Sequence, residues 1–167
     1  MAIAEDIARI IEQERRLEFT AFDESTAFSI LSRVRERGLA QGWPIVCDIR
    51  LWDRQMAFVT LPGASGDNAN WALRKSNTVR RLGKSSYRAK LEVDPAERMF
   101  PPHRNMPVSE FAFSGGGFPI RVKGAGIIGS IAVSGLPERD DHESIVAAVA
   151  AELGIDAASL ALAPAGK

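Results

Sequence analysis

Two neighbouring segments with alternating apolar residues, 45–52 and 56–61, constrain the fold of this chain more than any other feature of its sequence. In the first segment, four apolar side chains share one face, and the residues between them share the other; the four are Ile45, Cys47, Ile49 and Leu51. A period of two residues is that of a β-strand. Because Asp53 and Arg54 form a turn between the two segments, the sequence predicts a β-hairpin.

Two helices are expected before the hairpin. Apolar residues recur at helical spacing between residues 3 and 16, with Glu and Arg on the other face, which predicts an amphipathic helix. Asp23 is suited to cap a second helix, because its carboxylate can accept hydrogen bonds from the first free backbone amides. That helix is expected to end at Gly38 or Gly42, since glycine is common just past a helix C-terminus.

A third helix is expected directly after the hairpin, capped by Asp67 or Asn68 and running to Leu82 or Gly83. A loop with four prolines follows at 93–109. Three short strands are expected after it, at about 110–114, 118–123 and 126–134.

A last helix is expected from Asp140, as its cap, to Gly154, which ends it. Strands joined by hairpins form a mainly antiparallel sheet, and the helices must pack on that sheet to bury their apolar sides. The sequence therefore predicts an α/β (α+β) fold with one domain over 1–160 and a flexible tail over 161–167.

The charge balance argues against nucleic acid as a partner. Twenty-one Lys and Arg residues balance 21 Asp and Glu residues, so the chain has no general surplus of positive charge for duplex binding. No segment approaches the about 18 apolar residues that a membrane span needs, and the first residues do not resemble a secretory signal. Cys47 is the single cysteine, which excludes an intrachain disulfide. We therefore expect a soluble, cytoplasmic protein without a membrane partner.

Three motifs in the second half of the chain resemble those of a known family. They are a glycine-rich segment at 113–120, the glycine-containing strand at 126–136 and the acidic helix start at 140–142. In this order they resemble the GlcG/HbpS-like haem-degrading domain family. Trp71 and Lys75 resemble the W-x-x-x-K helix of its uncharacterised cytosolic branch.

The resemblance carries expectations for structure and function. It implies a profilin-like layered fold, in which an antiparallel sheet of about five strands is flanked by helices. It also implies a homo-oligomer and, in some members, a bound haem or related tetrapyrrole.

The first candidate binding site is the glycine-rich segment formed by Ser114, Gly115, Gly116, Gly117 and Phe118. Glycines let a ligand approach the main chain, and successive backbone N–H groups can form a nest for a carboxylate or propionate. The alternative is that the three glycines only make a tight strand connection or a bulge.

The second candidate is the basic stretch between Asp67 and Glu92, which contains seven Lys and Arg residues and no acidic residue. On a helix, Trp71, Lys75 and Thr78 share one face. The stretch is interpreted either as a site for propionates, phosphates or an acidic partner, or as a solvated face that pairs with a neighbouring subunit. Lys75 is the residue expected to contact a ligand carboxylate.

The two histidines are further candidates. His103, in the proline-rich loop, is either an axial haem ligand assisted by Met99 or Met106, or an exposed loop residue. His142 lies beside two aspartates, which indicate either metal binding or a capped helix start. Two distant histidines and one cysteine give no zinc spacing, so no metal site is expected.

Together these features favour an oligomeric small-ligand-binding protein. Phe113, Phe118 and Trp71 are expected to line its pocket, and Lys75 to hold the carboxylate of haem, of another tetrapyrrole or of a different anionic cofactor. The alternative is a structural or protein-interaction module without catalytic activity. The sequence contains no nucleophile elbow, phosphate loop or catalytic-triad motif, so no catalytic residue is assigned.

Overall fold

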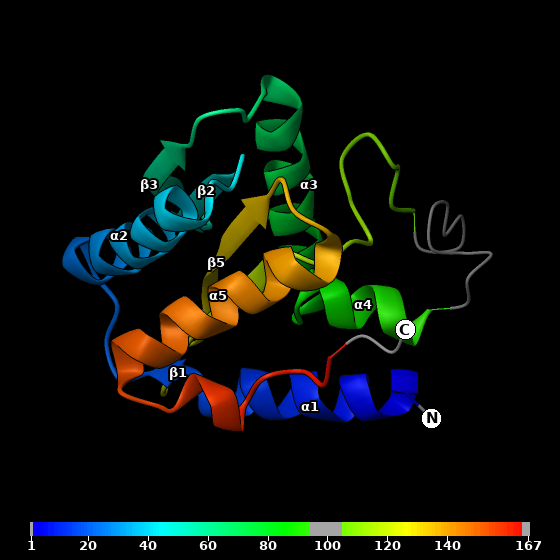
Figure 1. Cartoon of the computed structure of the whole chain (residues 1–167). Coiled ribbons are helices and arrows are strands. Elements are labelled where there is room, and N and C mark those ends of the chain that lie inside the picture. Colours follow the sequence, from blue (N-terminus) through cyan, green and yellow to red (C-terminus); the bar gives the residue numbers. More distant parts are fainter. Residues whose placement is uncertain (1, 94–104, 165–167) are drawn as a thin grey trace.

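A computed structural model describes residues 2–93 and 105–164 of the chain. Within these residues, two β-hairpins are separated along the sequence by two helices, and further helices precede the first hairpin and follow the second (Figure 1). In chain order the elements are α1 (Ala2–Arg16), β1 (Glu18–Phe19), α2 (Glu24–Gln41), β2 (Val46–Leu51), β3 (Arg54–Thr60), α3 (Gly66–Leu82), α4 (Ser86–Glu92), β4 (Gly117–Val122), β5 (Gly126–Ser134), α5 (Glu138–Leu153) and the 3₁₀ helix η2 (Ala157–Ser159).

The strands form one five-stranded sheet in the order β1-β4-β5-β2-β3. Two hairpins, β2–β3 and β4–β5, lie side by side because β5 pairs with β2 in an antiparallel register that places Val46 opposite Ser134. Only β1 pairs in parallel, with β4, among the residues described. The mainly antiparallel sheet expected from the hairpin pattern is therefore confirmed.

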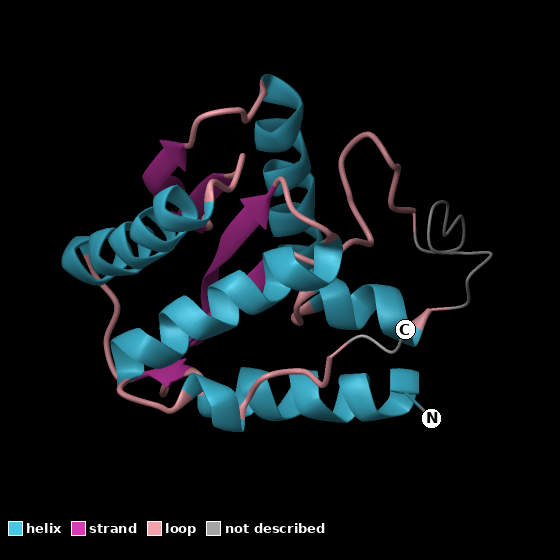
Figure 2. Ribbon diagram, in the orientation of Figure 1, coloured by secondary structure: helices cyan, strands magenta, loops and turns pink. Residues whose placement is uncertain are grey.

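Helices cover both faces of the sheet. Figure 2 shows α5 crossing the sheet beside α2, with α3 standing apart from them and α1 running along the lower edge. The core between the sheet and the α2–α5 pair is built from large aliphatic side chains, for example Ile30, Ile49, Ile131 and Ile145. On the opposite face, α3 packs closely through small side chains such as Ala72.

Several helix ends follow the sequence. Asp23 caps α2, since its carboxylate accepts a hydrogen bond from the backbone N–H of Thr26 at 2.9 Å. Gly42, Gly83 and Gly154 end α2, α3 and α5 in the left-handed conformation, with φ between 66° and 69°. Glycine reaches this region without a steric penalty, which is why the three ends were predictable.

The starts of two helices differ from the prediction. Helix α3 is capped by Ser65, and Asn68 lies inside the first turn, where its side chain accepts a hydrogen bond from the Ser65 backbone N–H at 2.9 Å. Helix α5 begins at Glu138 after Pro137, so Asp140 is within the helix and does not cap it. In both cases several polar residues compete for the cap position, and the sequence alone does not rank them.

The predicted strand at 110–114 is wrong. Ala112 donates its backbone N–H to the hydroxyl of Thr78 at 3.1 Å, and the same hydroxyl donates to the Ala112 carbonyl at 2.9 Å. A side chain of α3 thus takes the bonds that a strand would use. The fifth strand is instead the short β1, and α4 is an additional helix that the sequence analysis did not identify.

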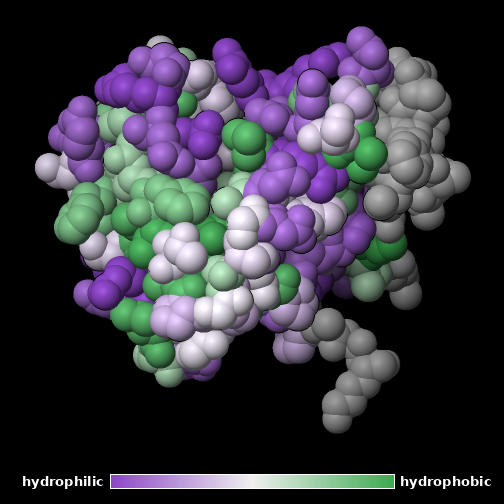
Figure 3. Space-filling view, turned by 90° about the horizontal axis from the view of Figure 1, so that it is seen from above, coloured by the Kyte–Doolittle hydropathy of each residue, from purple (hydrophilic) through white to green (hydrophobic). Residues whose placement is uncertain are grey.

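Apolar side chains remain exposed near the sheet edge formed by β3. Phe28 of α2 is 66% exposed and Phe58 of β3 is 40% exposed. Figure 3 shows apolar surface gathered toward the left of the molecule, the side on which α2 and β3 lie in Figure 1. Among the described helices, none is both long enough and apolar enough to cross a membrane.

Candidate functional site

A cleft of about 280 Å³ opens between the first half of α3 and the loop that joins β5 to α5. Three of the predicted site residues, Trp71, Lys75 and Ser114, meet in its lining. The complete lining is Asp67, Asn68, Trp71, Lys75, Ser114, Ser134, Gly135, Leu136 and Asp141. The walls are therefore mainly polar, and charged groups of both signs face the space.

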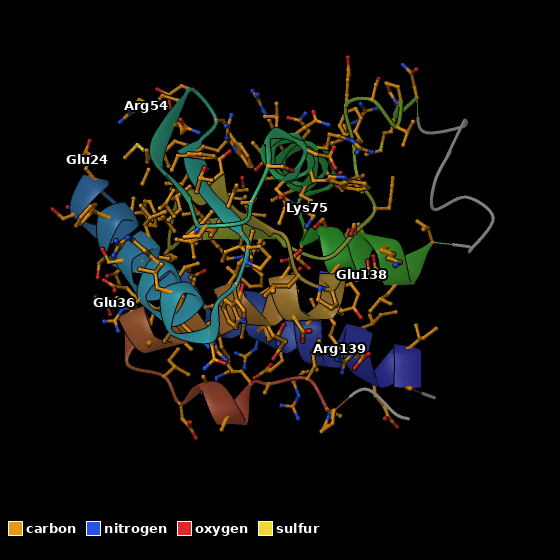
Figure 4. All side chains as sticks on the ribbon, turned by 45° about the horizontal axis from the view of Figure 1, so that its top comes forward. Glu24, Glu36, Arg54, Lys75, Glu138 and Arg139 are labelled. Carbon is orange, nitrogen blue, oxygen red and sulfur yellow. The ribbon has the colours of Figure 1, made fainter. Side chains whose placement is uncertain are left out.

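Lys75 is the central cation of the cleft, although its side chain is only 3% exposed. Its Nζ donates to the Val133 carbonyl at 2.9 Å and to Oδ2 of Asp141 at 3.0 Å. Burial lowers the pKa of Lys75, while the charge of Asp141 acts in the opposite direction. Figure 4 shows Lys75 between α3 and the beginning of α5, where Glu138 is also labelled.

Asp141 is the partner of Lys75, a role that the sequence did not indicate, since the aspartates beside His142 were interpreted as a metal site or a capped helix start. Its Oδ1 accepts the backbone N–H of Leu136 at 3.0 Å, so the carboxylate holds both the β5–α5 loop and Lys75. Burial raises the pKa of Asp141 to about 6, against the opposing effect of Lys75. An aspartate in the first turn of a helix resembles an ordinary dipole-stabilising residue, which is why the sequence did not single it out.

The three glycines pack behind Lys75 with little space to spare. A Cβ atom on Gly116, whose φ is +119°, would lie 2.3 Å from the Val133 carbonyl oxygen and 2.8 Å from Lys75 Nζ. The backbone N–H of Gly117 donates to Ser86 Oγ at 2.8 Å, and that of Gly115 to Glu138 Oε2 at 3.3 Å. These N–H groups are bound within the protein, which favours the tight-packing alternative over an open anion nest.

The two phenylalanines of the predicted pocket separate in the structure. Phe118 is 1% exposed and belongs to the core on the opposite face of the sheet, so it does not line the cleft. The alternation of β4 explains this correction, because neighbouring strand residues point to opposite faces. Phe113 lines a second cavity beside the cleft instead.

The histidine candidates do not reach the cleft within the described residues. His142 is fully buried, and its Nε2 lies 2.7 Å from Gln13 Oε1. Burial lowers its pKa to about 3, so the ring is neutral at physiological pH. His103 and Met99 lie outside the described residues, and Met106 is buried. The described residues contain no group of three or more His, Cys, Asp or Glu side chains suited to a metal ion.

The second cavity, of about 170 Å³, shares Trp71 and Ser114 with the cleft. Its remaining lining is Arg74, Lys90, Val108, Phe111, Ala112, Phe113 and Glu138. Lys90 and Glu138 form an ion pair there. In the sequence, Arg74 is only one member of the basic stretch, because a single sequence does not show that its side chain is buried.

Comparisons with known proteins agree with this architecture. A family model described as "Haem degrading protein HbpS-like" matches residues 22–150. A UPF0303 protein of Mesorhizobium japonicum is 50% identical over 163 residues, which is 98% of each chain. A UPF0303 protein of Brucella melitensis is 47% identical over 156 residues, covering 93% of this chain and 92% of the relative.

Solved structures of the same fold include the Ybr137w protein, with a TM-score of 0.76 and 25% identity over 87% of this chain and 86% of that one. HbpS has a TM-score of 0.62 and 21% identity, covering 82% of this chain and 93% of its own. A complex of PduOC with haem has a TM-score of 0.67 and 17% identity, covering 82% of this chain and 98% of that one.

Proposed function

Since the chain belongs to the HbpS-like haem-degrading family, we propose that it is an oligomeric protein that binds a small anionic ligand in the cleft beside Lys75. The observation that carries this proposal is the bonding of the Lys75 ammonium. An ammonium has three hydrogens, and within the described part of the chain two acceptors bind it, the Val133 carbonyl and Asp141. The third hydrogen is available to a ligand carboxylate in the cleft.

The protonation of Asp141 supports the same ligand class. A carboxylate bound to Lys75 would lie close to the Asp141 carboxylate, and two neighbouring negative charges favour protonation of one of them. The pKa of Asp141 is already raised to about 6 by burial, so little further change is needed. The pair can therefore accept an anion by taking up one proton.

The residues of the cleft suit the carboxylates of haem but not its iron. Within the described residues, neither the cleft nor the neighbouring cavity is lined by histidine, cysteine, methionine or tyrosine, the usual axial ligands of haem iron. Lys75 suits the carboxylate of a tetrapyrrole, but these lining residues do not suit its iron. The proposal is therefore a carboxylate site, with a tetrapyrrole propionate as one candidate.

A titration with haem and with metal-free protoporphyrin IX tests both parts of this proposal. We expect saturable binding of both compounds with similar affinity, because the carboxylates and not the iron are recognised. Lys75→Met should weaken binding at least tenfold, because a hydrogen bond to a charged group contributes about 1.5–3 kcal/mol. A loss of about 1.4 kcal/mol raises the dissociation constant tenfold. Lys123→Met is the matched control, because it removes an exposed lysine that does not line the cleft.

If Lys75→Met does not fold, the double variant Lys75→Met/Asp141→Asn removes both charges of the buried pair and serves in its place. Binding that is unchanged in these variants would contradict the location of the site. Binding of haem alone, without protoporphyrin, would show that an iron ligand outside the described residues dominates. If haem, protoporphyrin IX and a small dicarboxylate all failed to bind saturably, the proposed ligand-binding function would be contradicted.

The exposed apolar residues favour the oligomeric part of the proposal. Phe28 and Phe58 lie on α2 and on the edge strand β3, and an edge strand with apolar neighbours is suited to pair with another chain. We expect a mass of several subunits in light scattering, and a shift toward the monomer in Phe28→Ser/Phe58→Ser. A monomeric wild-type protein would exclude this assembly and leave these residues to a different protein partner.

A further inference from the structure

Arg74 is a buried cation whose bonding is incomplete. Its residue is 9% exposed, and Nε has no hydrogen-bond partner among the described residues. The side chain makes one hydrogen bond, from Nη2 to the Phe111 carbonyl at 3.3 Å, and no described carboxylate lies within 4.0 Å of it. The charge of Asp67 acts on Arg74 without a contact between the two side chains. Burial of a cation without a contacting carboxylate is costly, so this guanidinium is suited to an anion that the described residues do not supply.

The orientation of Arg74 prepares it for a planar anion. Its guanidinium carbon lies over the Trp71 ring, 4.2 Å from the ring centre. A guanidinium over an aromatic ring is attracted to the ring face and still has N–H groups for hydrogen bonds. A carboxylate can accept two parallel hydrogen bonds from such a group.

The cavity in front of Arg74 adds a requirement for an apolar body. Three of its walls are aromatic side chains, Trp71, Phe111 and Phe113, and Val108 and Ala112 complete the apolar part. The positive charge of Lys90 is balanced by Glu138, so Arg74 supplies the excess charge. A volume of about 170 Å³ lies below the roughly 300 Å³ at which drug-sized sites begin, so the ligand has about the size of one ring.

From the unpaired guanidinium and the aromatic walls, we propose that this cavity binds an aromatic carboxylate of single-ring size. The carboxylate pairs with Arg74, and the ring lies among Trp71, Phe111 and Phe113 in an offset or edge-to-face arrangement. This site goes beyond the function proposed above. It shares Trp71 and Ser114 with the Lys75 cleft but does not require that Lys75 bind a ligand.

Calorimetric titration with benzoate tests the proposal on the full chain. Benzoate should bind saturably, and benzyl alcohol and acetate at least tenfold more weakly, because each lacks either the carboxylate or the ring. Arg74→Gln should weaken benzoate binding at least tenfold, and Arg74→Lys should weaken it less, since an ammonium keeps the charge but loses the fork. Arg80→Gln is the matched control: it removes an exposed positive charge from the same helix, outside this cavity.

One further variant keeps the test decisive if the Arg74 variants do not fold. Val108→Phe should fill the cavity and abolish benzoate binding while Arg74 is retained. Equal binding by wild type and Arg74→Gln, or equal binding of benzoate and acetate, would overturn the proposal. The proposal would also fail if benzoate did not bind. If Arg74→Gln then dissociated the oligomer, the partner of the guanidinium would be a second copy of the chain.

Discussion

The two faces of the sheet bury side chains of different size and polarity. On the face covered by α2 and α5, strand β5 contributes Ile131 and Val133 to an aliphatic core. On the face covered by α3, the same strand contributes Ser130 and Ala132, and Ser130 Oγ donates to Ser76 Oγ at 2.9 Å. The small side chains bring α3 close to the sheet and give its polar groups partners there. The sheet thus separates a face that stabilises the fold from a face that holds charged groups in place.

The largest effect is expected from a cavity on the aliphatic face. Ile131→Ala should lower the free energy of unfolding by about 2–5 kcal/mol, because the lost side chain leaves a void in a packed core. Ser130→Ala, one residue away on the other face, should lower it by only about 1 kcal/mol through the loss of one hydrogen bond. Urea unfolding of both variants measures the difference, and equal losses would contradict the comparison.

Breaking the buried ion pair between α3 and α5 should have the next largest effect. Lys75→Met leaves Asp141 without its partner and should lower the free energy of unfolding by about 3 kcal/mol. The double variant Lys75→Met/Asp141→Asn should recover part of this loss, because no unpaired charge remains. A double-mutant cycle from denaturant unfolding gives the coupling, and strictly additive losses would show that the pair contributes nothing as a unit.

A smaller loss is expected where the glycines pack behind Lys75. Gly116→Ala should lower the free energy of unfolding by about 1–3 kcal/mol, since the residue combines a positive φ with contacts to the Val133 carbonyl and Lys75 Nζ. Gly124 is a matched control, because its φ of +81° carries a similar backbone penalty while a Cβ there would meet nothing within 4 Å. A loss in Gly116→Ala no greater than that in Gly124→Ala would show that the close packing has little energetic importance.

The remaining effects depend on pH and have opposite signs at two neighbouring residues of α5. The pKa of Asp141 is raised to about 6 in the folded protein, so the folded state binds more protons, and this group makes stability fall as pH rises from about 4 to 6. The pKa of His142 is lowered to about 3, so the unfolded state binds more protons, and this group makes stability rise between about pH 3 and 6.5. Each contribution is limited to about 1.4 kcal/mol per pH unit for one proton.

Chemical unfolding between pH 4 and 7 separates the two groups. Asp141→Asn should make the rise of stability with pH steeper, because the opposing carboxyl group is gone. His142→Gln should make it shallower or reverse it. Identical pH profiles in wild type and both variants would contradict the assigned pKa shifts.

Local patterns predicted much of the fold, because hairpins and glycine helix ends depend on neighbouring residues. The strand expected at 110–114 was wrong because the hydroxyl of Thr78, distant in sequence, takes the backbone bonds of Ala112. Such a tertiary partner leaves no period in the sequence. The short strand β1 was missed for a similar reason, since two residues are too few to show an alternation.

The lining of the candidate cleft was predictable in part, where a motif and an unusual charge pattern coincided. Trp71 and Lys75 were identified in this way, and the structure places both beside Ser114 in the cleft. Asp141 and Arg74 were not identified, because one resembles an ordinary helix start and the other an ordinary surface arginine. Their importance comes from burial, which depends on how α3 and α5 pack and not on local sequence.

The bond from Lys75 to the carbonyl of Val133 has a consequence for protein engineering. The acceptor is a main-chain oxygen, so a substitution at position 133 does not remove it. Asp67 and Ser134 line the same cleft but make no bond to the ammonium. A library that varies these two positions and keeps the Lys75–Asp141 pair would therefore change the walls of the cleft around a constant anchor.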